Sequence, residues 1–331
     1  MFRTISLLLT FLWSIASMTQ NITGQSPTAV NPVWPRDWPD PTVWLGEDGR
    51  YHCLATNPTR SLVSDDLFHW EMSNVSPIDV GSWGKMQAIA QRFWAPDVAT
   101  LPNGKRNLYL TLYNSAEDSN IGVLQEYAPG QFQFVGIITS SLTTGIHDTI
   151  DPEVVTDPKT GKVWLFFGSV GGIHRIELNK DGLSLKEGAT YEHVAGLKVE
   201  DNPSRSRVFE GSYLHRHGKY WYLFVSSGFF GDHTYQLKVG RAKKLTDDFF
   251  DRDGRPMKEG YATTVLHSDE GDKFYGPGHC GEIFKAKDGG EYIFYHCHVA
   301  GSRRPGSRPL FISPIKWDKE DWPYMEGGKP Q

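Results

Sequence analysis

The decisive stretch of the chain is Thr149-Ile150-Asp151-Pro152-Glu153-Val154-Val155, which continues through a polar turn into Val163-Trp164-Leu165-Phe166-Phe167-Gly168. It predicts a short apolar strand, a turn and a second strand rich in aromatic residues. An acid stands just before the first strand, and proline follows it.

The same arrangement occurs five times. We call the acid or histidine before the first strand of each unit its head, and the heads are Asp40, Asp97, Asp151, Glu210 and His279. Successive heads are 54 to 69 residues apart, and a turn followed by an aromatic strand comes after each. This period, with hairpin signals in every unit, is typical of a β-propeller. The sequence therefore predicts an all-β fold, a five-bladed β-propeller.

In a propeller, equivalent positions of the blades occupy equivalent positions around the ring. If the heads begin the innermost strands, they all meet at one end of the central axis. Asp-Pro and Asp-Gly are also ordinary turn sequences, and that reading suffices for any one acid alone. Four acids and a histidine in register would repel one another without helping folding, so the pattern as a whole favours a functional site.

Composition excludes several classes of protein. The 331 residues are 39% apolar and 13% aromatic, which is enough to bury a large core, and all-β rings of this size often form one domain. The net charge of −5 does not indicate a nucleic-acid-binding protein, which would be expected to carry a basic surface. We find no second domain, no phosphate-binding glycine loop and no Ser-His-Asp signature.

The N-terminus resembles an export signal. Arg3 precedes an apolar run from Ile5 to Trp13, with small residues at Ser14 and Ala16. The run is too short to span a bilayer comfortably. We therefore expect a signal peptide at 1–18, a polar tail at 19–34 and the propeller at 35–331. The mature protein should be exported, to the periplasm or the medium, without a membrane span, and monomeric.

Tryptophans flank two of the heads. Trp38 lies beside Asp40, and Phe93-Trp94-Ala95-Pro96-Asp97 repeats the pattern of aromatic, proline and acid. Apolar ring faces beside carboxylates suit sugars, whose C–H faces stack on aromatics while their hydroxyls need polar partners. Trp38 could equally belong to the core between blades.

Cys280 and Cys297 are symmetric about the Asp288-Gly289 turn, so in a simple hairpin they would face each other. A disulfide and two buried thiols are equally compatible with the sequence. A zinc site with the neighbouring histidines is disfavoured, because strand alternation points His279 and His298 away from the cysteines.

In order and spacing, several segments resemble glycoside hydrolase family 43, and within it the endo-1,5-α-L-arabinanases. The resemblance covers about Pro35 to Pro323. Its pieces are Pro39-Asp40-Pro41-Thr42-Val43, Phe93 to Val98, Ile150-Asp151-Pro152-Glu153-Val154, Phe209-Glu210-Gly211-Ser212-Tyr213 and Gly276-Pro277-Gly278-His279. Two non-catalytic stretches point to the arabinanase branch, Phe167 to Ile173 and Val239 to Leu245, the latter followed by Asp251 to Arg255.

The resemblance implies an inverting hydrolase of arabinan or a related plant cell-wall polysaccharide such as arabinoxylan. Asp40 would be the general base, Glu210 the general acid, and Asp151 the residue that orients the acid and tunes its pKa. His279 would help to hold a metal, usually calcium, largely through waters. Asp97, with Trp38 and Trp94, would contribute to substrate binding.

The sequence departs from the family pattern at Ser212, where proline is common, and at Cys280, where the arabinanases usually carry asparagine. Both changes concern the shape of the cleft rather than the catalytic residues. Alternative functions are an exo-acting α-L-arabinofuranosidase, a β-xylosidase, or a sugar-binding propeller without catalysis. The retained acids count against the last of these.

Overall fold

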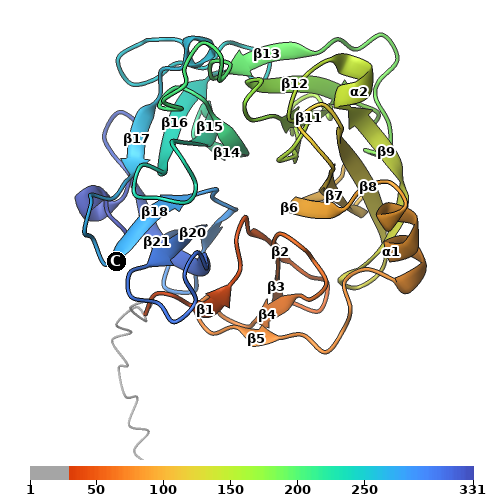
Figure 1. The fold of residues 1–331 in the computed structure, drawn as a ribbon, viewed down its shortest axis with the longest axis horizontal. Helices are drawn as coiled ribbons and strands as arrows, with labels where there is room; N and C mark the ends of the chain where they lie inside the picture. Colours follow the sequence, from red (N-terminus) through yellow and green to blue (C-terminus); the bar gives the residue numbers. More distant parts are fainter. Residues whose placement is uncertain (1–29) are drawn as a thin grey trace, which may run out of the picture.

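The computed structural model describes residues 30–331, and these form a ring of five antiparallel sheets around a central axis (Figure 1). The sequence prediction of a five-bladed β-propeller is confirmed. The expected signal peptide and most of the expected tail lie outside the described residues. Within the described residues, no helix is long and apolar enough to cross a membrane.

Four blades are meanders of four strands in chain order, each running from the axis outward. Blade I contains β2 (Thr42–Leu45), β3 (Tyr51–Leu54), β4 (Leu62–Ser64) and β5 (Glu71–Met72). Blade II contains β6 (Arg92–Thr100), β7 (Arg106–Tyr113), β8 (Ser119–Ala128) and β9 (Gln131–Ser140). Blade III contains β10 (Glu153–Thr156), β11 (Val163–Phe167), β12 (Ile173–Leu178) and β13 (Glu192–Ala195). Blade IV contains β14 (Glu210–His217), β15 (Tyr220–Ser227), β16 (Gln236–Ala242) and β17 (Thr263–Leu266).

Blade V closes the ring with strands from both ends of the described chain. Its strands are β18 (Phe274–Gly278), β19 (Ile283–Lys285), β20 (Glu291–Val299), β21 (Pro309–Trp317) and β22 (Pro323–Tyr324), and β1 (Trp34–Asp37) pairs with the outer side of β21. Asn31 adds side-chain hydrogen bonds to both backbone groups of Ile312. Residues 31–34, expected in the tail, are therefore bound to this blade.

Helical segments are short and peripheral. They are α1 (Val80–Gln87), α2 (Ser141–Thr144), η1 (Met257–Glu259) and η2 (Glu326–Gly328). Asp79 caps α1 by accepting the backbone N–H of Ser82, and the Ser82 hydroxyl in turn accepts the N–H of Phe134 on β9. This pair of contacts holds α1 against the edge of blade II.

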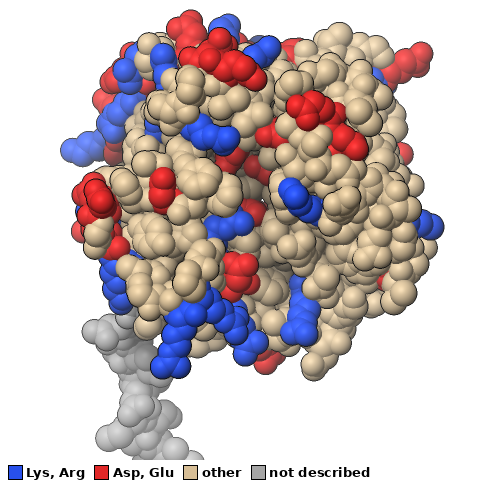
Figure 2. Space-filling model, viewed as in Figure 1, with Lys and Arg blue, Asp and Glu red and all other residues tan. Residues whose placement is uncertain are grey.

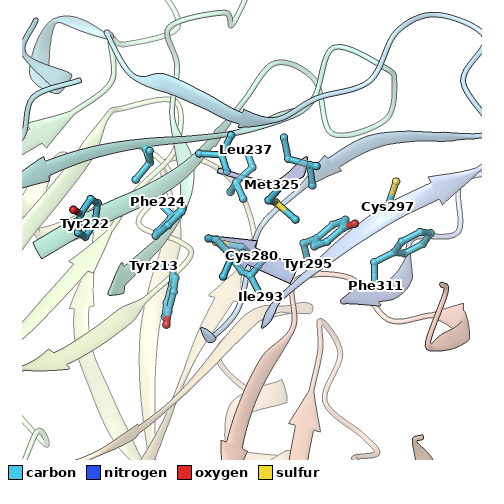
Figure 3. Close-up of a cluster of buried hydrophobic side chains, with 14 of the residues drawn as sticks. Tyr213, Tyr222, Phe224, Leu237, Cys280, Ile293, Tyr295, Cys297, Phe311 and Met325 are labelled. Atoms are coloured by element: carbon cyan, nitrogen blue, oxygen red, sulfur yellow. The ribbon is translucent and has the colours of Figure 1, made fainter. Parts of the chain in front are cut away.

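The core lies between the blades, because each sheet is apolar on both faces. One cluster joins blades IV and V through Tyr222, Phe224, Tyr295 and Phe311, all fully buried (Figure 3). Cys280 and Cys297 belong to this cluster as free thiols, so the disulfide that the sequence left open is not formed. A bulge shifts the pairing of β18 with β20, and the simple hairpin register that would oppose the two cysteines does not occur.

Around the axis, the innermost strands are tied together by a belt of five hydrogen bonds. In each blade, one side chain accepts a backbone N–H from an innermost strand of the next blade, which in blade V is β19. The acceptors are Thr42, Asp97, Glu153, Tyr213 and Glu282, and the donors are Val98, Val154, Leu214, Ile283 and Val43 in that order. Each donor directly follows the belt residue of its own blade in the sequence. The belt is thus one repeated contact that fixes the register of all five blades.

Three of the five belt acceptors, Asp97, Glu153 and Glu282, are buried carboxyl groups. Burial raises the pKa of Asp97, Glu153 and Glu282, and their mutual repulsion raises the first two further. For Glu282 the pKa rises to about 7. Its oxygens accept from the hydroxyl of Thr42 and the N–H of Val43, which partly stabilises the charge.

We predict that Glu282 makes stability depend on pH. The folded protein binds the Glu282 proton more tightly than the unfolded chain does, so this contribution favours folding at acidic pH and is lost as the pH rises through about 7. A shift from 4.5 to about 7 corresponds to about 3 kcal/mol. Glu282→Gln keeps an acceptor for Val43 without the charge, and should flatten the pH dependence of the unfolding free energy in urea between pH 4.5 and about 7.

Glu187→Gln is the matched control, because it removes the same charge from an exposed position. An unchanged pH slope in Glu282→Gln would contradict the prediction.

Candidate active site

Five residues, each a head or within two positions of one, form a second ring above the belt, which we call the ring of heads. At one position of each blade the backbone adopts the left-handed conformation, with φ between 40° and 60°, and these positions are Asp40, Ala95, Asp151, Gly211 and His279. The N–H of each donates to a side chain of the preceding blade, and the acceptors are His296, Thr56, Thr111, Asp151 and Ser226 in that order. A non-glycine residue in this conformation is strained, so the inter-blade bonds hold the heads where they are.

Asp40 is held by several donors. Its Oδ2 accepts from the Thr56 hydroxyl at 2.6 Å, and its Oδ1 lies 3.1 Å from Nη1 of Arg308 and 3.4 Å from Nδ1 of His279. Burial alone would raise the pKa of Asp40. Arg308, His279 and His296 together outweigh burial and hold this pKa well below its usual range, with the Arg308 guanidinium the largest of the three. Asp40 is therefore a carboxylate at neutral pH.

Asp151 and Glu210 are linked through the backbone, because Oδ2 of Asp151 accepts the N–H of Gly211 at 3.1 Å. Burial raises the pKa of Asp151 well above its usual range, and the charges of Glu210 and Asp40 raise it further. Asp151 therefore holds its proton to higher pH than an ordinary aspartate does.

Glu210 is oriented by two hydroxyl groups. Tyr235 donates to Oε1 at 2.8 Å, and Ser169 donates to Oε2 at 2.7 Å. Tyr235 is 1% exposed, so its ring cannot move without disturbing the packing around it. Both ends of the Glu210 carboxyl group are thereby fixed relative to Asp151.

His279 is close to two of the acids, with Nδ1 3.4 Å from Asp40 and 3.9 Å from Asp151. Burial lowers its pKa despite the nearby carboxylates, which favours the neutral imidazole. In the described part of the chain, no three His, Cys, Asp or Glu side chains are arranged as direct metal ligands. The donor set therefore fits a cation only if waters complete its shell.

These groups line one cavity of about 220 Å³, which lies among the blades at the axis. Its walls are Asp40, Thr56, Trp94, Ile150, Asp151, Glu210, Phe230, Tyr235, His279 and Arg308. Acidic side chains are visible within the hollow at the centre of the ring, and basic ones lie around it (Figure 2). Trp94 is half-buried and stacks on Tyr113 with 4.1 Å between ring centroids, which leaves an aromatic wall beside the carboxyl groups.

Five of the seven side chains singled out from the sequence meet in this cavity, and two do not. Asp97 is not at the mouth: it belongs to the belt, where it accepts the N–H of Val154. A bulge between Trp94 and Asp97 puts Ala95 in the head position, two residues earlier than expected. Trp38 is 8% exposed, packs on Trp34 and donates to the sulfur of Cys53, so it is core rather than a sugar platform.

The sequence did not reveal several contributors to the site, among them Thr56, whose hydroxyl donates to Asp40. Ser169 and Tyr235 follow the second strands of blades III and IV, and Arg308 and His296 belong to blade V. Ser169 lies within a segment read as non-catalytic. A polar residue after the second strand, facing the head of a neighbouring blade, is a signal that could have identified it.

Comparison with known proteins agrees with this geometry. The profile of the glycosyl hydrolases family 43 matches residues 29–323. The chain belongs to this family, and is thus a glycoside hydrolase.

The chain is 29% identical to an extracellular exo-α-(1→5)-L-arabinofuranosidase of Cellvibrio japonicus, over 86% of this chain and 85% of that protein. It is 28% identical to an extracellular endo-α-(1→5)-L-arabinanase of Bacillus subtilis, over 86% of each. Among solved structures, it is similar to the Cellvibrio cellulosa α-L-arabinanase complexed with arabinohexaose. The TM-score is 0.74 at 27% identity, over 87% of this chain and 95% of that one.

Proposed function

We propose that the protein is an inverting endo-1,5-α-L-arabinanase that cleaves arabinan chains. The observation that carries the proposal is the meeting, in one cavity with Glu210, of a carboxylate kept ionised, Asp40, and a carboxyl group whose pKa is raised, Asp151. Hydrolysis of a glycosidic bond requires one ionised and one protonated carboxyl group. The names of the relatives supply the sugar and the linkage.

In the proposed reaction, a water molecule loses a proton to Asp40 while its oxygen attacks the anomeric carbon. The bond from that carbon to the leaving oxygen breaks, and Glu210 protonates the leaving oxygen. Arg308 keeps Asp40 ionised and in place. Asp151 positions Glu210 through the N–H of Gly211, and the hydroxyls of Tyr235 and Ser169 orient the acid.

Endo action is supported by a second hollow beside the catalytic cavity. It has a volume of about 550 Å³ and is lined by residues 145–147, 170–171, 174, 198 and 200–201. The loop that supplies Gly145–His147 continues to Ile150 and Asp151 in the catalytic cavity. This neighbouring space could hold further sugar units of a chain that extends beyond the cleavage point. The relatives' description as extracellular supports export of this protein, and we propose that it acts as a monomer.

The products from linear arabinan test the activity. We expect a ladder of arabino-oligosaccharides early in the reaction, resolved by anion-exchange chromatography, and no comparable release from xylan. If arabinose were the sole early product, the enzyme would be exo-acting and the proposal of endo action would be wrong. Release of xylose from xylan at a higher rate than release of arabinose from arabinan would instead indicate a xylosidase.

Single substitutions should separate the two catalytic roles. Glu210→Ala should lose at least about 10²-fold on arabinan and less on aryl arabinofuranosides, whose phenolate leaving groups need little protonation. Asp40→Ala should lose activity on both substrates and regain part of it with azide, giving a product of inverted configuration. NMR of the wild-type reaction shows the configuration of the first-formed sugar. A retained configuration would require Asp40 to be a nucleophile and would contradict the proposed mechanism.

We also propose that His279 supports a hydrated calcium ion on the axis, with waters between the ion and the carboxylates. Hard cations prefer oxygen ligands and keep part of their hydration, and a neutral imidazole can order such waters. Chelation should lower the melting temperature by a few degrees. Added calcium should restore it, and His279→Ala should lose this response. A melting temperature indifferent to chelator in the wild type would refute the calcium site.

A further inference from the structure

His298 on β20 is a buried histidine that the proposed reaction does not use. It is 3% exposed, and the ring of Tyr275 from β18 stacks on it with 4.8 Å between centroids. Its Nδ1 lies 3.1 Å from the carbonyl oxygen of Ser307, and its Nε2 lies 2.9 Å from the carbonyl oxygen of Phe230. Both ring nitrogens therefore face a backbone carbonyl.

This geometry constrains the protonation state of His298. A carbonyl oxygen can only accept a hydrogen bond, and a neutral imidazole carries a single N–H. In either neutral tautomer, one ring nitrogen would direct its lone pair at a carbonyl oxygen about 3 Å away, which is repulsive. Both contacts are hydrogen bonds only when the ring is an imidazolium that donates from each nitrogen.

The two carbonyl groups belong to loops that supply walls of the catalytic cavity. Phe230 lies in the loop between β15 and β16 of blade IV, and Ser307 directly precedes Arg308 in the loop between β20 and β21 of blade V. Phe230 and Arg308 both line the cavity, and the Arg308 guanidinium lies over the Phe230 ring at 5.1 Å. His298 thus connects the two loops next to the residues that reach the sugar site.

We propose that His298 is a positioning residue whose imidazolium clamps the loops of Phe230 and Arg308 together, so that sugar binding weakens when the ring loses its proton. The effect on sugar binding rests on the function proposed above. The double donation by the ring does not.

Charged residues lie on both loops that His298 joins. Arg308 belongs to the blade V loop, and Asp232, whose carboxylate accepts from Thr234, belongs to the blade IV loop. The backbone carbonyl of Asp232 lies against Gly276 of β18, which itself contacts the His298 ring. The two carbonyl dipoles are the direct compensation for burying the charge.

The protonation state can be measured directly in the wild-type protein. Long-range ¹H–¹⁵N spectra of protein labelled at histidine distinguish an imidazolium from either neutral tautomer, and the spectrum of His298→Gln assigns the signal. We expect both nitrogens of His298 to be protonated over the pH range in which KM for arabino-oligosaccharides is lowest. A single neutral tautomer throughout that range would overturn the clamp, whatever the activity of the enzyme.

Kinetics between about pH 5 and 9 test the consequence for binding. In the wild type, KM should rise on the order of tenfold as His298 deprotonates, with a smaller change in kcat. His298→Gln, which cannot place donors at both ring-nitrogen positions, should show the high KM without that rise. His298→Phe, which keeps a ring against Tyr275 but has no donor, should bind at least as weakly.

His233→Gln is the matched control in the same loop, because only the backbone carbonyl of His233 takes part in the anchoring, through the Ser268 hydroxyl. The KM of His233→Gln should change with pH as the KM of the wild type does. A KM for His298→Gln with the same pH dependence as the wild type would overturn the role in binding. Absence of activity on every arabinan substrate would reject the proposed function instead, and the NMR measurement would still decide the clamp.

Discussion

The structure depends on one contact that is repeated at two levels: a backbone N–H of one blade donates to a side chain of the blade before it. In the belt, the acceptors are part of the innermost strands themselves. In the ring of heads above it, the acceptors lie mostly on or just after second strands. Innermost strands have no neighbouring strand on their axial side, so buried N–H groups there would otherwise lack partners, at a cost of roughly 1–3 kcal/mol each.

The ring of heads is also what assembles the catalytic groups. Asp40 and Asp151 adopt left-handed backbone conformations that aspartate tolerates better than most residues. In blade IV the equivalent position is Gly211, and its N–H donates to the Asp151 carboxylate. Glu210 is therefore placed beside Asp151 by a backbone contact. The same bond that joins two blades brings Glu210 close enough for its charge to raise the pKa of Asp151.

Opposite electrostatic environments distinguish the acids within one small cavity. Arg308 holds Asp40 ionised, whereas Asp151 lies among carboxylates and retains a proton. Each residue arrives from a different blade, and Arg308 comes from the loop that precedes the closing strand β21. The closure of the ring by β1 and β21 is thus coupled to the chemistry, because Arg308 also accepts the N–H of Trp38 and donates its own to Asp37.

The sequence by itself determined the five-fold repeat, the all-β class and the gathering of Asp40, Asp151, Glu210 and His279, because period, turn residues and strand patterning are local properties. It misplaced Asp97 by two residues, since a bulge within β6 leaves no mark in the spacing of the heads. It also left Trp38 ambiguous between core and cleft. Only the tertiary structure decided which side chains from neighbouring blades complete the site, among them Arg308, Tyr235 and Ser169. Those contacts join residues far apart in the chain, and the ring closure that brings them together follows from how five sheets pack, which no single segment encodes.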